Sequence, residues 1–134
     1  MNNNIEKLWN NFKNNKDIDV NFKEEIRNID NSIKEKDIDL KKKVLLDIED
    51  KYKEILDARG YYKIKNMVDA KTYMVNNEKE LNTLLGNLKV WIVRIAYLEN
   101  NQNEEINKIY SNIEKEKDIE KIYKLLDKAD SLMI

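Results

Sequence analysis

Apolar residues recur along most of the chain at steps of three and four, the spacing of one face of an α-helix. Phe22, Ile26, Ile29 and Ile33 form the clearest single stripe. Polar runs separate such stripes, most clearly at residues 100–103. The pattern predicts an all-α protein, a helical bundle of five to seven helices.

Four further stripes have the same spacing. The third of the predicted helices weakens at Gly60, which either follows that helix as its C′ residue or lies inside one longer helix that runs to residue 75. The step from Ile113 to Ile119 is out of phase for one stripe, so we place a break near Asp118. The stripes consist of Ile5, Leu8, Trp9 and Phe12; Val44, Leu45, Ile48, Tyr52, Ile55 and Leu56; Ile106, Ile109, Tyr110 and Ile113; and Ile119, Ile122, Tyr123, Leu126, Ala129, Leu132 and Met133.

Short polar side chains mark several helix starts. Asp19 is placed to cap the second helix, and Asn77 followed by Glu80 has the spacing of a capping box. The phrase KDID begins at Lys16 and at Lys36, and KDIE begins at Lys117. Because these spacings are unequal, we interpret the phrases as independent helix starts and not as a structural repeat.

The helix predicted at about residues 78–99 is apolar on two faces and lies at the centre of the bundle. The second seam, our name for Gly86, Val90, Val93 and Tyr97, follows the spacing i, i+4, i+7 and i+11. A helix that is apolar nearly all round is buried, so other helices of the chain or a partner must cover this seam. We predict a partner face there, with Gly86 permitting close approach. The first face consists of Leu81, Leu84, Leu85, Leu88, Trp91, Ile92, Ile95 and Leu98.

Composition supports one helical domain over residues 1–134. The chain has no proline and two glycines, so little in it interrupts a helix. Charged residues make up 38% and apolar residues 41% of the sequence, which fits a folded protein with wet helix faces.

The absence of histidine and cysteine argues against catalysis. It removes the commonest general base, the thiol nucleophile and the commonest transition-metal ligands. Asp47, Asp50, Glu54 and Asp57 could resemble an oxygen-ligand metal site, but they lie opposite the apolar stripe of their helix, so we expect a solvated face. We therefore expect no enzyme, no metal and no cofactor.

The start of the chain has no basic segment followed by an apolar run, which is the pattern of a signal peptide. The most apolar segment, VWIVRIAYL, is about half the length of a membrane span and contains Arg94. We expect a cytoplasmic protein with no membrane contact. The 25 basic and 26 acidic residues nearly cancel, so any nucleic-acid site must be local.

Residues 51–71 carry a local basic excess, six basic residues against three acidic ones. Within it, RGYYKIK places Arg59, Tyr61, Tyr62, Lys63 and Lys65 around Gly60. This mixture suits phosphate contacts and base stacking. The alternative is a helix junction in which the tyrosines pack and the lysines are solvated.

From residue 59 onward the order of features resembles the small helical subunit of type III-A CRISPR effector complexes. The similar segments are KIKNM from Lys63, NLKVWIVRIAYLENN from Asn87 and KEKDIEKIYKLLDKA from Lys115. The resemblance covers residues 59–134. It implies a non-catalytic subunit that stacks on its copies and lines a nucleic-acid path, with Lys65, Lys89 and Arg94 at the matching positions.

The residues thus favour a non-enzymatic interaction or assembly protein that contacts another protein or a second copy of itself. The alternative is a small nucleic-acid-contacting subunit of a ribonucleoprotein complex.

Overall fold

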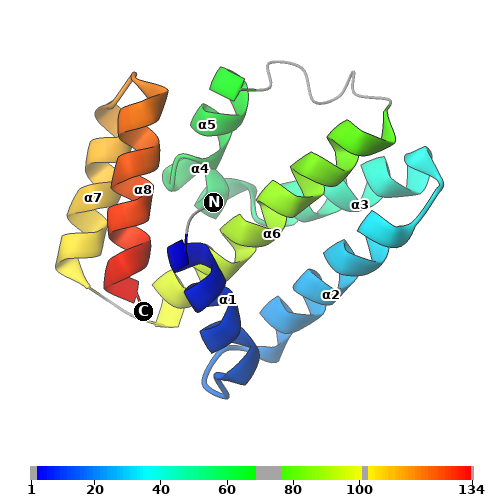
Figure 1. Ribbon diagram of the computed structural model, residues 1–134, viewed down its shortest axis with the longest axis horizontal. Coiled ribbons are helices and arrows are strands. Elements are labelled where there is room, and N and C mark those ends of the chain that lie inside the picture. The colour runs from blue at the N-terminus through cyan, green and yellow to red at the C-terminus, as the bar shows by residue number, and fades with distance from the viewer. Residues whose placement is uncertain (1–2, 69–76, 101–102, 134) are drawn as a thin grey trace.

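The computed structural model describes residues 3–68, 77–100 and 103–133 (Figure 1). Within these ranges the chain forms helices and no strand, so the predicted all-α class is confirmed. The helices are α1 (Asn3–Asn14), α2 (Val20–Lys34), α3 (Ile38–Lys51), α4 (Lys53–Ala58), α5 (Tyr61–Val68), α6 (Glu78–Asn100), α7 (Glu104–Lys115) and α8 (Ile119–Met133).

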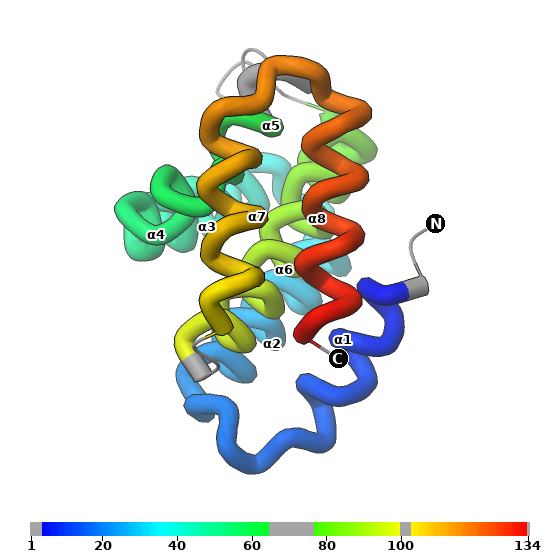
Figure 2. The backbone as a smooth tube through the Cα atoms, turned by 90° about the vertical axis from the view of Figure 1, so that its left-hand side faces the viewer, coloured from blue at the N-terminus to red at the C-terminus, as the bar shows by residue number. Residues whose placement is uncertain are grey.

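Helix α6 is the central helix of the bundle, as its two apolar faces predicted. Helices α2 and α3 pack along it on one side, and α1 packs on its C-terminal half. Helices α7 and α8 pair as a hairpin that lies in front of α6 in Figure 2. Helix α6 therefore has neighbours on most of its circumference but not along its whole length.

The first face of α6 forms the middle of the hydrophobic core. Each of its eight residues is at most 8% exposed, and Leu81, Leu85, Leu88, Ile92 and Ile95 are fully buried. Buried side chains from all eight described helices join the same cluster. This burial is the main stabilising contribution, because each fully buried aliphatic side chain is worth about 1.5–3 kcal/mol.

The predicted helix caps are present. Asp19 Oδ1 accepts a hydrogen bond from the Asn21 amide at 2.9 Å, and Asn77 Oδ1 accepts one from the Glu80 amide at 3.1 Å. Asp37 and Asp118 cap α3 and α8 through amides two residues later. The KDID and KDIE phrases are therefore independent helix starts, as we interpreted them.

The predicted third helix is divided in two, which the sequence pattern did not indicate. The backbone of Tyr52 leaves helical geometry at φ −107° and ψ 14°, so Tyr52 ends α3 and begins α4. The Tyr52 ring stacks on Phe22 of α2 with centroids 6.0 Å apart, and the neighbouring Lys51 pairs with Glu25. These tertiary contacts hold the chain at the break, where no glycine or proline would have marked it.

Gly60 separates α4 from α5 and does not lie inside a longer helix. Its φ is +90°, the left-handed region that glycine occupies without the steric penalty of a Cβ. Of the two alternatives that the sequence left open, Gly60 is therefore the C′ residue of a helix and not part of one longer helix. The remainder of the predicted helical pattern, at residues 69–76, lies outside the described residues.

Candidate functional site

The second seam of α6 is buried at one end and only partly buried at the other. Val93 is 5% and Tyr97 is 6% exposed, whereas Gly86 and Val90 are only half-buried. All four lie on one line along the helix, so the difference comes from what packs against each end. The structure thus divides the predicted partner face into a covered half and an open half.

Helix α1 covers the C-terminal half of the second seam. The Tyr97 hydroxyl donates a hydrogen bond to the backbone carbonyl of Leu8 at 3.4 Å. Leu8 and Phe12 of α1 are buried in the same core cluster as Val93 and Tyr97. Helix α1 also packs on α8, where Asn4 Nδ2 donates to Asp127 Oδ1 at 3.1 Å. Figure 2 shows α1 beside the C-terminal end of α8.

The open half begins at Gly86. A Cβ built on Gly86 meets no described atom within 4 Å, apart from the neighbouring backbone of its own helix. A glycine inside a helix costs about 1 kcal/mol relative to alanine, yet no packing within the described residues requires it here. Gly86 and Val90 therefore form a shallow, small-residue surface on α6.

Lys89 lies at the border of the second seam, and its ammonium group has partners within the same chain. Its ammonium group pairs with Asp30 of α2 at 2.7 Å and lies 4.1 Å from the centroid of the Trp9 ring of α1. The side chain is 24% exposed. Lys89 therefore fastens α6 to α1 and α2 on one side of the seam.

Arg94 lies at the opposite border and is buried. Its guanidinium donates to Asp130 of α8 through Nε at 3.0 Å and through Nη2 at 2.9 Å, and it lies 5.0 Å from the Trp91 ring. Arg94 is 7% exposed and Asp130 is 0% exposed. Burial raises the pKa of the Asp130 carboxyl, while the bonds from Arg94 oppose that shift. Arg94 therefore fastens α6 to α8.

Two cations of the RGYYKIK segment bind to helix α7 of the same chain. Arg59 Nη1 donates to Asn107 Oδ1 at 3.3 Å, and its guanidinium lies 5.5 Å from the Tyr110 ring. Lys63 Nζ donates to the carbonyls of Ile113 and Glu114 at 2.9 and 2.6 Å. Lys63 thus adds a donor to carbonyls in the last turn of α7, where the Ile113 carbonyl also accepts from the Glu116 amide.

The two tyrosines of that segment also pack inside the protein. Tyr61 is 3% exposed, its ring lies edge-on to Trp91, and its hydroxyl donates to buried Glu49 at 2.9 Å. Tyr62 is half-buried, donates to the Glu49 carbonyl at 3.3 Å, and has its pKa raised to about 12 chiefly by burial. The side chain of Lys65 lies outside the described part of the chain. Most of the described RGYYKIK contacts are therefore those of a helix junction.

The acidic row on α3 and α4 is exposed along its whole length, which confirms a solvated face for Asp47, Asp50, Glu54 and Asp57. Among the described residues no three acidic side chains lie close enough together to hold a metal ion. Within the same ranges no helix has the length and apolar character needed to cross a bilayer.

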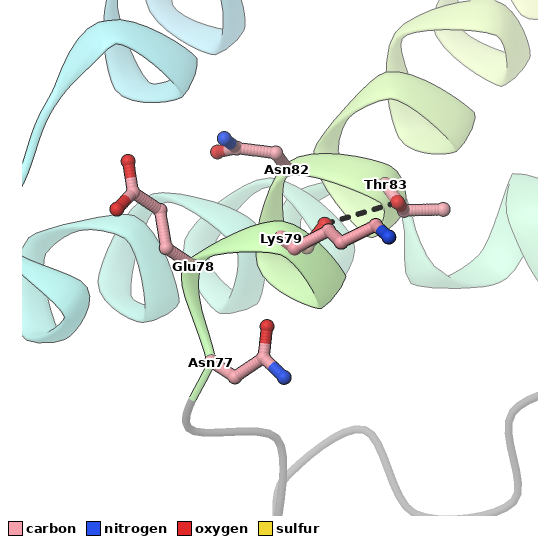
Figure 3. Close-up of a pocket in the computed structure, with 5 residues that line it drawn as sticks. All are labelled: Asn77, Glu78, Lys79, Asn82 and Thr83. Carbon is pink, nitrogen blue, oxygen red and sulfur yellow. Dashed lines mark hydrogen bonds between the residues drawn. The ribbon is translucent and has the colours of Figure 1, made fainter.

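A shallow hollow lies at the N-terminal end of α6, and Figure 3 shows its lining. The described residues that line it are Asn77, Glu78, Lys79, Asn82 and Thr83. The Thr83 hydroxyl is already bound to the Lys79 carbonyl at 3.0 Å, and Asn77 caps the helix. The hollow therefore offers little free chemistry beyond the helix end itself.

The sequence pattern missed two buried charges that position α6. Lys41 is 0% exposed and donates to the Ile33 carbonyl at 3.0 Å and to Asn82 Oδ1, which joins α2, α3 and α6. The sequence pattern also did not indicate that Asp130 is the partner of Arg94. A signal for Asp130 did exist: its carboxylate lies beside the apolar stripe of its helix, and Arg94 is the cation inside the apolar segment VWIVRIAYL.

Comparisons with known proteins add no relative. Neither the family models, nor the curated sequences, nor the solved structures give a match to this chain. The resemblance of residues 59–134 to a CRISPR subunit therefore stays a prediction that rests on the sequence alone.

Proposed function

We propose that this protein is a non-enzymatic interaction and assembly protein that acts through protein–protein contacts on the open half of the second seam. The observation that carries the proposal is the contrast within one line of residues. Val93 and Tyr97 are buried by the chain's own helices, and Gly86 and Val90 are only partly buried. When a line of apolar residues extends past the helices that bury part of it, the uncovered part is typical of a surface on which another helix packs.

Gly86 adds an independent argument. Glycine lowers the stability of a helix interior, and within the described fold it has no neighbour that would exclude a side chain. Its small size does serve a helix that approaches α6 from outside, because the two backbones can then come close. The partner in this proposal is another protein or a second copy of the chain.

A nucleic-acid role is the second candidate, and it has less support. Arg59, Lys63 and Lys89 donate to groups of the same chain, and Arg94 is buried against Asp130. Tyr61 is buried, so its ring does not offer a face for base stacking. Salt-sensitive retention of single-stranded RNA in a gel shift would favour this candidate.

We place the function in the cytoplasm and propose no catalytic step. A chain without cysteine suits a reducing compartment, and a chain without histidine lacks the commonest general base. These arguments come from composition and not from the shape of the surface.

The experiment is photo-crosslinking in cells of the protein's source. A photoreactive phenylalanine derivative is placed at Val90 in one variant and at Tyr123 in a control variant. Tyr123 is a matched control because it is 50% exposed on α8 and lies outside the second seam. The proposal predicts a discrete adduct, to a protein or to a second copy, from position 90 and not from position 123. Equal or absent adducts at both positions would overturn it.

A further inference from the structure

Helix α1 packs on the covered half of the second seam, with its apolar side facing α6. It meets Tyr97 through the Leu8 carbonyl, and the Trp9 ring lies against Lys89 at the seam's border. Leu8 and Phe12 are its buried side chains, at 0% and 2% exposure, while Trp9 is half-buried. The surface beside α6 thus already accepts an amphipathic helix.

The anchoring of α1 is modest for a helix of 12 residues. Of its described side chains Leu8 and Phe12 are buried, Ile5 and Trp9 are partly buried against the core, and the residues on its outer face are exposed. An exposed hydrogen bond from Asn4 to Asp127 links α1 to the hairpin. Elements with few buried contacts open more readily than the core of a domain.

The dimensions of the second seam match a helix of this size. Gly86 to Tyr97 is a separation of 11 residues, which at about 1.5 Å per residue is roughly 16 Å along α6. A helix with the 12 residues of α1 is about 18 Å long by the same measure. Helix α1 leaves Gly86 and Val90 only partly buried, so a helix that replaced it would have the longer line of all four residues to lie along.

We propose that α1 is a displaceable occupant of the second seam, and that the partner presents an amphipathic helix of the same chemistry. That helix carries apolar residues at i, i+3, i+4 and i+7, as Ile5, Leu8, Trp9 and Phe12 do, and lies along Gly86, Val90, Val93 and Tyr97 once α1 has left. This inference rests on the proposed function, because it names the partner of the same surface. It adds that binding and the docking of α1 are mutually exclusive.

The absence of cysteine makes a clean test feasible. Asn4→Cys and Asp127→Cys are introduced together in the full chain, where the native side chains meet at 3.1 Å, and oxidation is verified by mass. The probe is a fluorescent synthetic peptide with the sequence of residues 3–14, NNIEKLWNNFKN. The control peptide carries Leu8→Asp and Phe12→Asp, and binding is followed by fluorescence anisotropy.

Displacement predicts that oxidation of the double-cysteine protein weakens peptide binding at least tenfold and that reduction restores it. A full-length Leu8→Ala variant, whose own α1 is less firmly docked, binds the peptide at least tenfold more tightly than the wild type. The control peptide binds none of these proteins. Equal binding by the oxidised and reduced proteins, or failure of the Leu8→Ala variant to gain affinity, would overturn the inference.

Hydrogen exchange of the unmodified protein gives a second measurement. The amides of α1 are expected to exchange at least tenfold faster than those of the first face of α6, because α1 opens without global unfolding. Equal protection of the two helices would also overturn displacement. The two proposals can fail separately. If position 90 forms the crosslink but oxidation and Leu8→Ala do not change peptide binding, the proposed function holds and the displacement of α1 is overturned.

Discussion

Arg94 of α6 and Asp130 of α8 form a two-bond ion pair inside the protein, with donor–acceptor distances of 3.0 and 2.9 Å. Neither residue exposes more than 7% of its surface. The pair fixes the α7–α8 hairpin on the central helix. Because Arg94 is buried in this pair, its guanidinium is not accessible to an external ligand.

The first prediction concerns the loss of one partner from that pair. Asp130→Ala should lower the free energy of unfolding by about 3–5 kcal/mol, because it leaves the Arg94 guanidinium buried and uncompensated. The double variant Arg94→Met with Asp130→Leu should recover most of that loss, since apolar residues of similar volume carry no desolvation cost. Urea denaturation monitored by circular dichroism measures both. Equal losses in the single and double variants would contradict this account of the pair.

The second prediction concerns Tyr110, whose buried hydroxyl has no hydrogen-bond partner among the described residues. Tyr110→Phe should leave stability at pH 7 unchanged or raise it by about 1 kcal/mol, because an unsatisfied polar group is removed. Thermal denaturation measures the change. Tyr123→Phe, at an exposed position, serves as the control and should have no effect.

Tyr110→Phe should also change how the free energy of unfolding depends on pH in the alkaline range. Burial raises the pKa of Tyr110 from 10.0 to about 12. Between these values the unfolded chain has released the proton and the folded chain has kept it, so the free energy of unfolding falls as pH rises. The fall is about 1.4 kcal/mol per pH unit for this group. Tyr110→Phe should make it shallower, and an unchanged slope would show that Tyr110 does not titrate in this way.

The third prediction contrasts the two glycines. Gly86→Ala should stabilise the protein by about 0.5–1 kcal/mol, because alanine favours the helix and no described atom obstructs its Cβ. Gly60→Ala should destabilise it by about 1–3 kcal/mol, since φ is +90° and the new Cβ would lie 3.0 Å from Ile113 Cγ2. Differential scanning calorimetry compares the two. A loss of stability in Gly86→Ala would mean that the helix needs glycine for its own packing.

Much of the fold was predictable because its determinants are local. Asp19 and Asn77 cap the helices that follow them, and the apolar spacing of α6 places it at the centre. The break at Tyr52 was not predictable, because it depends on stacking against Phe22, 30 residues earlier in the chain.

The fate of the candidate site residues was harder to predict for the same reason. Arg59 and Lys63 look available in the sequence, and their acceptors lie about 50 residues later, in α7. The cover of the second seam comes from α1, and the Tyr97–Leu8 bond spans 89 positions. Periodicity identifies an apolar face, but it cannot say which distant helix packs on it.

The central claim is that the open half of the second seam binds a protein partner or a second copy. The most direct measurement is sedimentation velocity of the purified complex, or of the chain alone over a concentration series, for wild type, Val90→Asp and the control Tyr123→Asp. Val90 lies outside the fully buried core, so circular dichroism should show an intact fold in its variant. The account predicts that Val90→Asp weakens association at least tenfold while Tyr123→Asp does not. Association that is unchanged in Val90→Asp, with the fold intact, would contradict it.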